Sequence, residues 1–436
     1  MAKKSTNLIL ILIIAAIAII IIAALFLRST FKEKSAIDPS IRFTEHTREG
    51  NAALFILGDY FHEAFANELG TILLELPPDC TNYIVCNERM RGGLTTWTAK
   101  ENLPQPVFYT DSRTTPIMKV WARDLVIAGS TGNRVTVVVA PYMHARTEAE
   151  AALFYNALRE LFPGNFDVVL APFAFEAGNL IFIERGNKRI LIAGKKLLFD
   201  NARYQRRPWT PGWSGETLID NIRDFLHVDS VVVAGLIQQQ PPLEIYFDYH
   251  LDMGMTVLRE NTAVVAQFPF GELERRQLRD AIDKNHPIIR SLFERERDRN
   301  EIYTLLAERL AAVSGEYNHY AALAERLGLE VIRSPMQWQH VASWRSWTNV
   351  LQVGTRLFVP VYPESLGTIA ETVRDQRGSI MKQIQLEAVA NDRFEMTGYN
   401  LQNHDLYADL GYDVVSIPEY LHYFEGGIHC FVNILY

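Results

Sequence analysis

The residues best suited to chemistry lie at the C-terminal end of the sequence, in the segment Gly426-Gly427-Ile428-His429-Cys430. A cysteine that follows a glycine pair and opens an apolar strand has two interpretations. It can be a buried free thiol that packs as a small hydrophobic residue. It can also be a nucleophile at the mouth of a strand, where glycines let a substrate approach the backbone. One cysteine does not decide between these alternatives, so the rest of the chain must supply a base and a substrate site.

Polar residues recur at an equivalent place elsewhere, directly before the first strand of each predicted β-hairpin. The segments are Trp121-Ala-Arg-Asp124, Glu176-Ala-Gly-Asn179, His250-Leu-Asp252 and Ser346-Trp-Thr-Asn349. Carboxylates, a histidine and a thiol are costly at positions where a packed core prefers apolar residues. If the hairpins are related by pseudo-symmetry, these positions converge, and together they form a candidate active site.

Each motif also has a purely structural interpretation. Asp124 can form an internal ion pair with Arg123, and Glu176 can bond to backbone amides in a turn. His250 and Asp252 share one face if their segment is a strand, because side chains alternate there with period two. The same pair could begin a metal site, but no third and fourth ligand follow at a suitable spacing, so no metal is expected.

The converging groups favour one class of substrate. Three carboxylates around a thiol repel anions and can hold a guanidinium, whose five N–H donors form a fixed planar fork. The thiolate of Cys430 would attack the guanidinium carbon. His250 is the expected acid and base, because His429 would point away from Cys430 on a regular strand. The expected intermediate is an amidino-thioether on Cys430, and this chemistry requires no cofactor.

Strand and turn patterns organise these motifs into about five repeating units. Apolar segments with short polar turns predict hairpins at 124–140, 179–193, 254–267 and 349–361, and the first strand of a fifth at 430–436. Further strands are predicted at 167–173, 229–236, 329–335 and 412–418, and helices at 52–76, 148–161, 214–225 and 370–388. This repetition favours a five-bladed, pseudo-symmetric α/β propeller over a doubly wound sheet. The charged stretch 272–327 is interpreted as a helical insertion with a solvated face.

The N-terminal region differs in composition from the rest. Residues 7–27 form an unbroken apolar run, which is typical of a transmembrane helix. Residues 28–50 are polar and mixed in charge, as in a juxtamembrane tether, and 51–436 form the expected catalytic domain. These features predict a single-pass membrane protein. Lysine and arginine flank the apolar run on both sides, so the side of the membrane is left open.

Charge and cysteine content set further limits. The net charge of −8 argues against a general nucleic-acid-binding protein and suits a cationic substrate. Three cysteines in 436 residues exclude a disulfide scaffold. Cys80 and Cys86 could pair with each other, which would leave Cys430 as the single thiol.

The sequence resembles the guanidino-group-modifying (pentein) superfamily, in particular its agmatine deiminase and bacterial-type peptidylarginine deiminase branch. The likeness covers most of residues 105–436, and its motifs end at Asp124, Asn179, Asp252 and Cys430, in the family's order. It implies a five-bladed α/β propeller with Cys430 as nucleophile and His250 as general acid/base. It also implies a substrate site whose residues are Asp124, Asp252, Glu176, Trp121, Asn179 and Gly427.

The sequence departs from the family pattern at three places. Leu125-Val126 stand where Gly-Pro is usual, Ala177 stands where glycine is usual, and the insertion at 272–327 is long. These changes affect loops around the far end of a substrate, so they leave open which guanidine is bound.

The expected function is hydrolytic deimination of a guanidinium substrate, with release of ammonia. The substrate class is agmatine, arginine or an arginine-containing peptide. Two alternatives stay open: amidino transfer on the same scaffold, and a non-catalytic propeller that acts as a membrane-tethered binding domain. The oligomeric state is also open.

Overall fold

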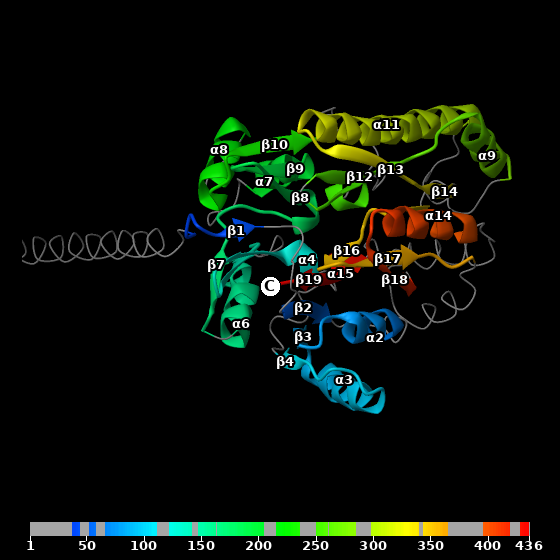
Figure 1. The fold of residues 1–436 in the computed structure, drawn as a ribbon. Coiled ribbons are helices and arrows are strands. Elements are labelled where there is room, and N and C mark those ends of the chain that lie inside the picture. Colours follow the sequence, from blue (N-terminus) through cyan, green and yellow to red (C-terminus); the bar gives the residue numbers. More distant parts are fainter. Residues whose placement is uncertain are drawn as a thin grey trace, which may run out of the picture.

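The computed structural model describes residues 37–43, 52–57, 66–110, 122–141, 147–162, 164–204, 215–235, 250–259, 261–284, 298–339, 343–364, 396–418 and 428–435. Within these ranges the chain alternates strands and helices, as an α/β protein does (Figure 1).

Five sheet units of the same construction carry the site. In each unit two antiparallel strands form a pair, and a third strand joins the second one in parallel. The triplets are β5 (Val126–Thr131), β6 (Arg134–Val139) and β7 (Phe166–Leu170); β8 (Leu180–Arg185), β9 (Lys188–Gly194) and β10 (Ser230–Ala234); β11 (Met255–Leu258), β12 (Thr262–Gln267) and β13 (Glu330–Pro335); β16 (Leu351–Val353), β17 (Arg356–Val361) and β18 (Asp413–Pro418); and β19 (Val432–Ile434), β2 (Ala52–Leu57) and β3 (Thr81–Cys86). The four complete hairpins predicted from the sequence are confirmed, as are the four further strands.

The fifth unit joins segments from opposite ends of the sequence. Strand β19 pairs antiparallel with β2, and the amide of Leu435 donates to the carbonyl of Ala52 at 2.6 Å. The sequence predicted a helix over 52–76, and this is wrong for residues 52–57, which form β2, whereas α2 confirms it for Ala66–Glu75. All six residues of β2 are buried. A strand buried on both faces is a continuous apolar run, which periodicity alone does not distinguish from a helix.

Smaller strands extend this framework. Strand β4 (Val107–Thr110) continues the fifth unit beside β3, and β1 (Arg42–Phe43) pairs with β5. Strands β14 (Gln337–Gln339) and β15 (Ser343–Arg345) form a separate antiparallel pair.

Helices pack against the sheet units, as Figure 1 shows for α6, α8, α11 and α14. Their bounds are α2 (Ala66–Glu75), α3 (Glu88–Lys100), α5 (Glu148–Ala151), α6 (Leu153–Leu161), α7 (Lys196–Tyr204), α8 (Gly215–Leu226), α9 (Glu272–Asp283), α11 (Arg299–Arg326) and α14 (Met396–Asp409). The predicted helices at 148–161 and 214–225 are confirmed by α5, α6 and α8. The predicted helix at 370–388 lies outside the described residues.

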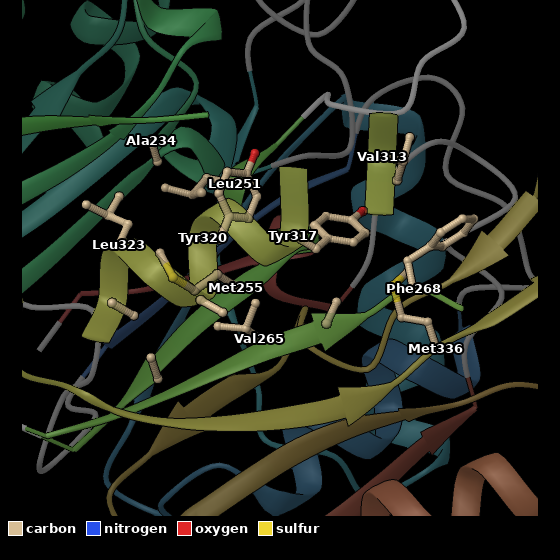
Figure 2. Close-up of a cluster of buried hydrophobic side chains, with 14 of the residues drawn as sticks. Ala234, Leu251, Met255, Val265, Phe268, Val313, Tyr317, Tyr320, Leu323 and Met336 are labelled. Carbon is tan, nitrogen blue, oxygen red and sulfur yellow. The ribbon is translucent and has the colours of Figure 1, made fainter. Parts of the chain in front are cut away.

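The predicted insertion at 272–327 contains α9 and α11, and α11 is more than a solvated connection. Its side chains Leu310, Tyr317 and Tyr320 are buried in one hydrophobic cluster with strands β11 and β12. Figure 2 shows Tyr317 and Tyr320 of this helix beside Leu251 and Met255. The insertion therefore supports the strand that begins directly after His250 and Asp252.

The expected membrane location requires correction. In the part of the chain that the structure describes, no helix is long and apolar enough to cross a bilayer. The apolar run 7–27 and most of the tether 28–50 lie outside the described residues.

The suggested pairing of Cys80 with Cys86 is also corrected. Both thiols are free and buried. Cys80 precedes β3 and Cys86 ends it, and a strand of this length separates its ends by roughly 20 Å. A disulfide needs Cα atoms within about 7 Å of each other.

Candidate active site

Short helical turns carry the polar groups at the head of each hairpin. Turn α4 (Ala122–Leu125) contains Asp124, and turn η2 (Ala177–Asn179) directly follows Glu176. Turn η3 (Leu251–Met253) follows His250 and contains Asp252, and turn α15 (Ile428–Phe431) contains Cys430. These turns contact one another, α15 against α4, α4 against η2, and η2 against η3.

The expected side-chain directions of His429 and Cys430 assumed a regular strand, and this assumption is wrong, because both residues lie in turn α15. Successive side chains diverge by roughly 100° in a helical turn rather than by 180° as in a strand. His429 and Cys430 are therefore both directed into the buried interior, where their side chains are 4% and 1% exposed. The argument that set His429 aside as facing away from Cys430 does not hold.

A thiol–imidazole contact forms the centre of the site. The Sγ of Cys430 lies 3.7 Å from Nδ1 of His250, although the two residues are 180 positions apart in the sequence. Gly178 makes this contact possible, because a Cβ atom there would lie 2.8 Å from the same Nδ1. The absence of a side chain at residue 178 thus leaves the space that the imidazole occupies.

The other ring nitrogen of His250 faces two carboxylates. Nε2 lies 3.0 Å from Oε2 of Glu176 and 3.6 Å from Oδ1 of Asp124. All three side chains are at least nine-tenths buried. The ring is therefore held from both ends, by a thiol on one side and by carboxylates on the other.

A lysine and a second acid extend this group. Nζ of Lys196 lies 2.9 Å from the same Oε2 of Glu176 and 2.6 Å from Oδ2 of Asp200. Glu176 thus lies between a histidine and a lysine. Lys196 was not identified from the sequence, although a lysine that begins a helix directly after a buried strand is an available signal.

Asp252 is held by a second histidine. Its Oδ2 lies 2.9 Å from Nδ1 of His429, and its backbone carbonyl accepts from Oγ1 of Thr348 at 3.2 Å. Its other carboxylate oxygen, Oδ1, is buried and has no hydrogen-bond partner among the described residues. One side of the carboxylate is fixed, and the other side is left to accept a hydrogen bond.

Asn349 connects the fourth hairpin to the thiol. Its Nδ2 donates to Sγ of Cys430 at 3.5 Å, and its Oδ1 accepts from the backbone N–H of His429 at 2.9 Å. The sequence identified the segment 346–349 as equivalent to the other hairpin heads but assigned it no site residue. That equivalence was the signal that would have included Asn349.

The charges within the site determine its resting protonation. Burial and the charges of Asp252 and Asp124 together raise the pKa of the Cys430 thiol to about 12, against the opposing effect of His250. Burial alone would lower the pKa of His250, but the charge of Asp124 and the contacts with Cys430 and Glu176 raise it well above its ordinary value. Burial also opposes ionisation of Glu176, but His250 and Lys196 bring its pKa down to about 2. The site at rest holds a neutral thiol beside an imidazolium and a carboxylate.

The remaining predicted site residues have different positions. Trp121 and Gly427 lie outside the described residues. Asn179 is buried, and its side-chain oxygen lies against Gly194 at the end of β9. The structure thus brings Cys430, His250, Asp124, Glu176 and Asp252 into one buried group and adds Asn349, His429 and Lys196.

The fold assembles more potential metal ligands than the sequence spacing indicated. One donor atom each from Asp124, His250 and Cys430 lies within 4.8 Å of the others. We do not assign them as metal ligands, because the thiol and the imidazole contact each other directly and Nε2 of the imidazole already faces both carboxylates.

Comparison with known proteins agrees with this architecture at the level of fold. No protein-family model matches the chain, and no curated protein matches it in sequence. Solved structures of the guanidino-group-modifying (pentein) type do match, so the resemblance inferred from the motifs is confirmed for the fold.

Three of these structures show the extent of the match. The agmatine deiminase of C. jejuni has a TM-score of 0.53 at 11% identity, over 90% of this chain and 95% of that one. The agmatine deiminase of Enterococcus faecalis has a TM-score of 0.53 at 12% identity, over 90% and 95% of the two chains. A protein classed as a peptidyl-arginine deiminase has a TM-score of 0.55 at 12% identity, over 91% and 98%.

Proposed function

We propose that the protein hydrolyses a guanidinium group to a ureido group and ammonia, through a covalent amidino-thioether on Cys430. The observation that carries this proposal is the buried contact between Sγ of Cys430 and Nδ1 of His250, with the carboxylates of Glu176 and Asp124 at the other ring nitrogen. A thiol, an imidazole and several acids in one water-poor site suit a cationic, planar electrophile.

The two aspartates are the proposed guanidinium ligands. Asp252 supports this role because Oδ1 lacks a hydrogen-bond partner among the described residues, while His429 holds Oδ2. Asp124 approaches the imidazole at 3.6 Å, a looser contact than that of Glu176. Carboxylates that accept from the edges of a guanidinium leave the face of its carbon open to the thiol.

Binding of the substrate would itself activate the nucleophile. The carboxylates Asp252 and Asp124 both raise the pKa of Cys430 in the resting site. A bound cation offsets these negative charges, and the pKa of the thiol then falls. The proton of the thiol passes to solvent as the substrate arrives, because His250 is already protonated, so the reactive thiolate forms only when there is something for it to attack.

His250 has the position of the proton carrier. In the first half, the Cys430 thiolate forms a C–S bond, and His250 gives its proton to the departing nitrogen, which leaves as ammonia. In the second half, His250 takes a proton from water, the hydroxide forms a C–O bond, and the C–S bond breaks with Cys430 leaving as the thiolate. The C–OH group then loses its proton to give the ureido carbonyl, and this proton converts the ammonia to ammonium. One guanidinium and one water thus give one ureido product and one ammonium ion.

We also propose that the five units form a pseudo-symmetric propeller and that 51–436 is the catalytic domain. The common strand order of the units supports this, as does the pairing of β19 with β2. In such an arrangement each hairpin head reaches the same central place. The proposed partner is a small guanidine or an arginine-containing peptide.

Product analysis tests the proposal. The protein is incubated with agmatine, arginine, methylated arginines and arginine peptides, and the ureido product is measured together with the released amine, which is ammonia or, from a methylated arginine, a methylamine. Equal amounts of both support hydrolysis. Amidino transfer predicts a new guanidine when an amine is added, without a ureido product, and a binding domain predicts no turnover. Cys430→Ala should abolish turnover in a folded protein, and activity in that variant would contradict the role of the thiol.

A further inference from the structure

Lys196 occupies an unfavourable place for a lysine. It is the first residue of α7, which has no acidic residue in its first turn. A cation at the N-terminal end of a helix opposes the helix dipole. Its pairing with Asp200 four residues later runs in the less favourable order for a helical ion pair. Local helix stability does not explain this lysine.

The surrounding structure nevertheless fixes Lys196 firmly. The side chain of the preceding Lys195 forms an ion pair at 3.2 Å with the buried Glu316 of α11. The backbone amide of Lys195 donates to the carbonyl of Ala234. Gly235, with φ of +104°, leaves room for the Glu316 carboxylate. The start of α7 is thus held from the sheet and from the inserted helix, which directs Lys196 towards Glu176.

Glu176 shares one oxygen between two cations. Its Oε2 lies 2.9 Å from Nζ of Lys196 and 3.0 Å from Nε2 of His250. A single carboxylate oxygen bound by two donors attracts each less than it would attract one alone. Lys196 therefore limits how strongly Glu176 can hold the proton of His250.

We propose that Lys196 is a positioning residue that divides the Glu176 carboxylate between itself and His250, and so keeps the imidazole able to give up its proton. The inference rests on the proposed function for its catalytic consequence. The charged and titratable groups around His250 are Asp124 on α4, Glu176 before η2, Asp252 in its own turn and Cys430 on α15. Three of these four are acids, and Lys196 supplies the cation that offsets them.

Neutralising Lys196 and neutralising its partner Asp200 should shift the pKa of His250 in opposite directions. Lys196→Met keeps the length of the side chain and removes its charge, so the pKa of His250 rises by about one unit. Asp200→Asn leaves Lys196 entirely to Glu176 and also removes an acid whose charge acts on His250, so the pKa of His250 falls. Lys196→Arg retains the charge, and its effect is smaller than that of Lys196→Met. A merely structural role predicts no such reversal of sign.

The test is titration of His250 by NMR in the full-length protein labelled at histidine, with the signal assigned by its loss in His250→Asn. Opposite shifts in Lys196→Met and Asp200→Asn support the inference. Shifts in the same direction, or no shift in either variant, overturn it. If Lys196→Met does not fold, Lys196→Arg and Asp200→Asn are used in its place. The inference then requires a lowered pKa of His250 in Asp200→Asn.

Kinetics separate this inference from the proposed function. With a guanidine that the protein hydrolyses, Lys196→Met should lower kcat about 10-fold with little change in KM, because His250 then holds its proton too strongly to give it to the departing nitrogen. If no guanidine is hydrolysed by the wild-type protein, the proposed function fails, while the opposite NMR shifts would still establish the role of Lys196. A larger effect on KM than on kcat would contradict that role.

Discussion

The amide of Asn349 donates to Sγ of Cys430 at 3.5 Å, across 81 positions of sequence. The same side chain accepts from the backbone N–H of His429, so its orientation is fixed with Nδ2 towards the sulfur. A hydrogen-bond donor stabilises a thiolate more than a thiol. Asn349 thus favours the reactive form of the nucleophile in a site whose carboxylates oppose it.

Asn349→Asp should make Cys430 less reactive. The change removes the donor and places a further negative charge beside the sulfur, which raises the pKa of the thiol above its already raised value. Alkylation by 2-chloroacetamide at pH 9 should slow by about 10-fold or more, because each pKa unit is a factor of ten in thiolate. The rate is measured by mass spectrometry of the Cys430 peptide.

Asn400→Asp is a matched control for this substitution. Asn400 is a partly buried asparagine whose side chain hydrogen-bonds to Trp347 and Tyr362, away from the thiol. The same chemical change there should leave the alkylation rate of Cys430 close to that of the wild type. Equal slowing in both variants would show that Asn349 acts only through the fold.

A cationic reagent should react with Cys430 far faster than a neutral one with the same leaving group. We expect 2-chloroacetamidine to alkylate Cys430 faster than 2-chloroacetamide does, because its amidinium offsets the charges of Asp124 and Asp252. Both of these charges raise the pKa of the thiol. In Asp124→Asn and Asp252→Asn this preference should fall by about 10-fold, which corresponds to one pKa unit. The measurement is the ratio of the two rate constants at pH 7.5.

Asp280→Asn provides the control for charge loss alone. Asp280 is 61% exposed and pairs with Lys284 on the surface of α9, where screening makes an ion pair weak. Its substitution should leave the ratio unchanged. A similar loss of preference in all three variants would mean that the aspartates of the site act no differently from a surface charge.

His429 should influence the affinity for the substrate through its hydrogen bond to Asp252. In His429→Ala, Oδ2 of Asp252 loses its donor at 2.9 Å, and the carboxylate is free to rotate away from its substrate-binding orientation. KM for the guanidine should rise by about 10-fold, the equivalent of one hydrogen bond to a charged group. His429→Asn places an amide donor near the former Nδ1 and should recover most of the affinity. Failure of Asn to restore KM would exclude the hydrogen bond as the cause.

Local sequence patterns predicted the hairpins well, because each is specified by neighbouring residues. The turns at Gly132 and Gly186 have positive φ, and the strands around them alternate or form apolar runs. The pairing of β19 with β2 depends on residues about 380 positions apart. No local pattern records such a contact, so the apolar residues 52–57 were interpreted as part of a helix.

The candidate site was predicted to the extent that its residues occupy equivalent positions. Cys430, His250, Asp252, Glu176 and Asp124 all stand at hairpin heads, which marked them as a group. Two features of the site were not predicted. The helical turns changed the expected direction of His429. Lys196 was overlooked although it follows the second strand of the hairpin 179–193, whose end at Ala193 pairs with Leu180 close to Glu176. Side-chain direction within a turn follows from the backbone, which periodicity does not supply.

Gly178 lies where two site residues come closest to the backbone. A Cβ atom there would be 2.8 Å from Nδ1 of His250 and 3.1 Å from Oδ2 of Asp252. The distance to Nδ1 is too short for a methyl group, the distance to Oδ2 is tight, and the imidazole is buried, so His250 must shift to admit a side chain. The backbone at Gly178 does not require positive φ, so a substitution there acts through contact and not through strain.

Gly178→Ala should therefore separate His250 from Cys430 in a protein that still folds. A displacement of the imidazole by about 1 Å lengthens the present 3.7 Å contact and lowers kcat by about 100-fold. The melting temperature, followed by circular dichroism, should fall by only a few degrees, because one methyl group costs about 1–3 kcal/mol. Gly315→Ala on α11 is the control, since a Cβ there meets no atom within 4 Å, and it should keep full activity. Wild-type turnover in Gly178→Ala would show that the contact between His250 and Cys430 does not limit the reaction.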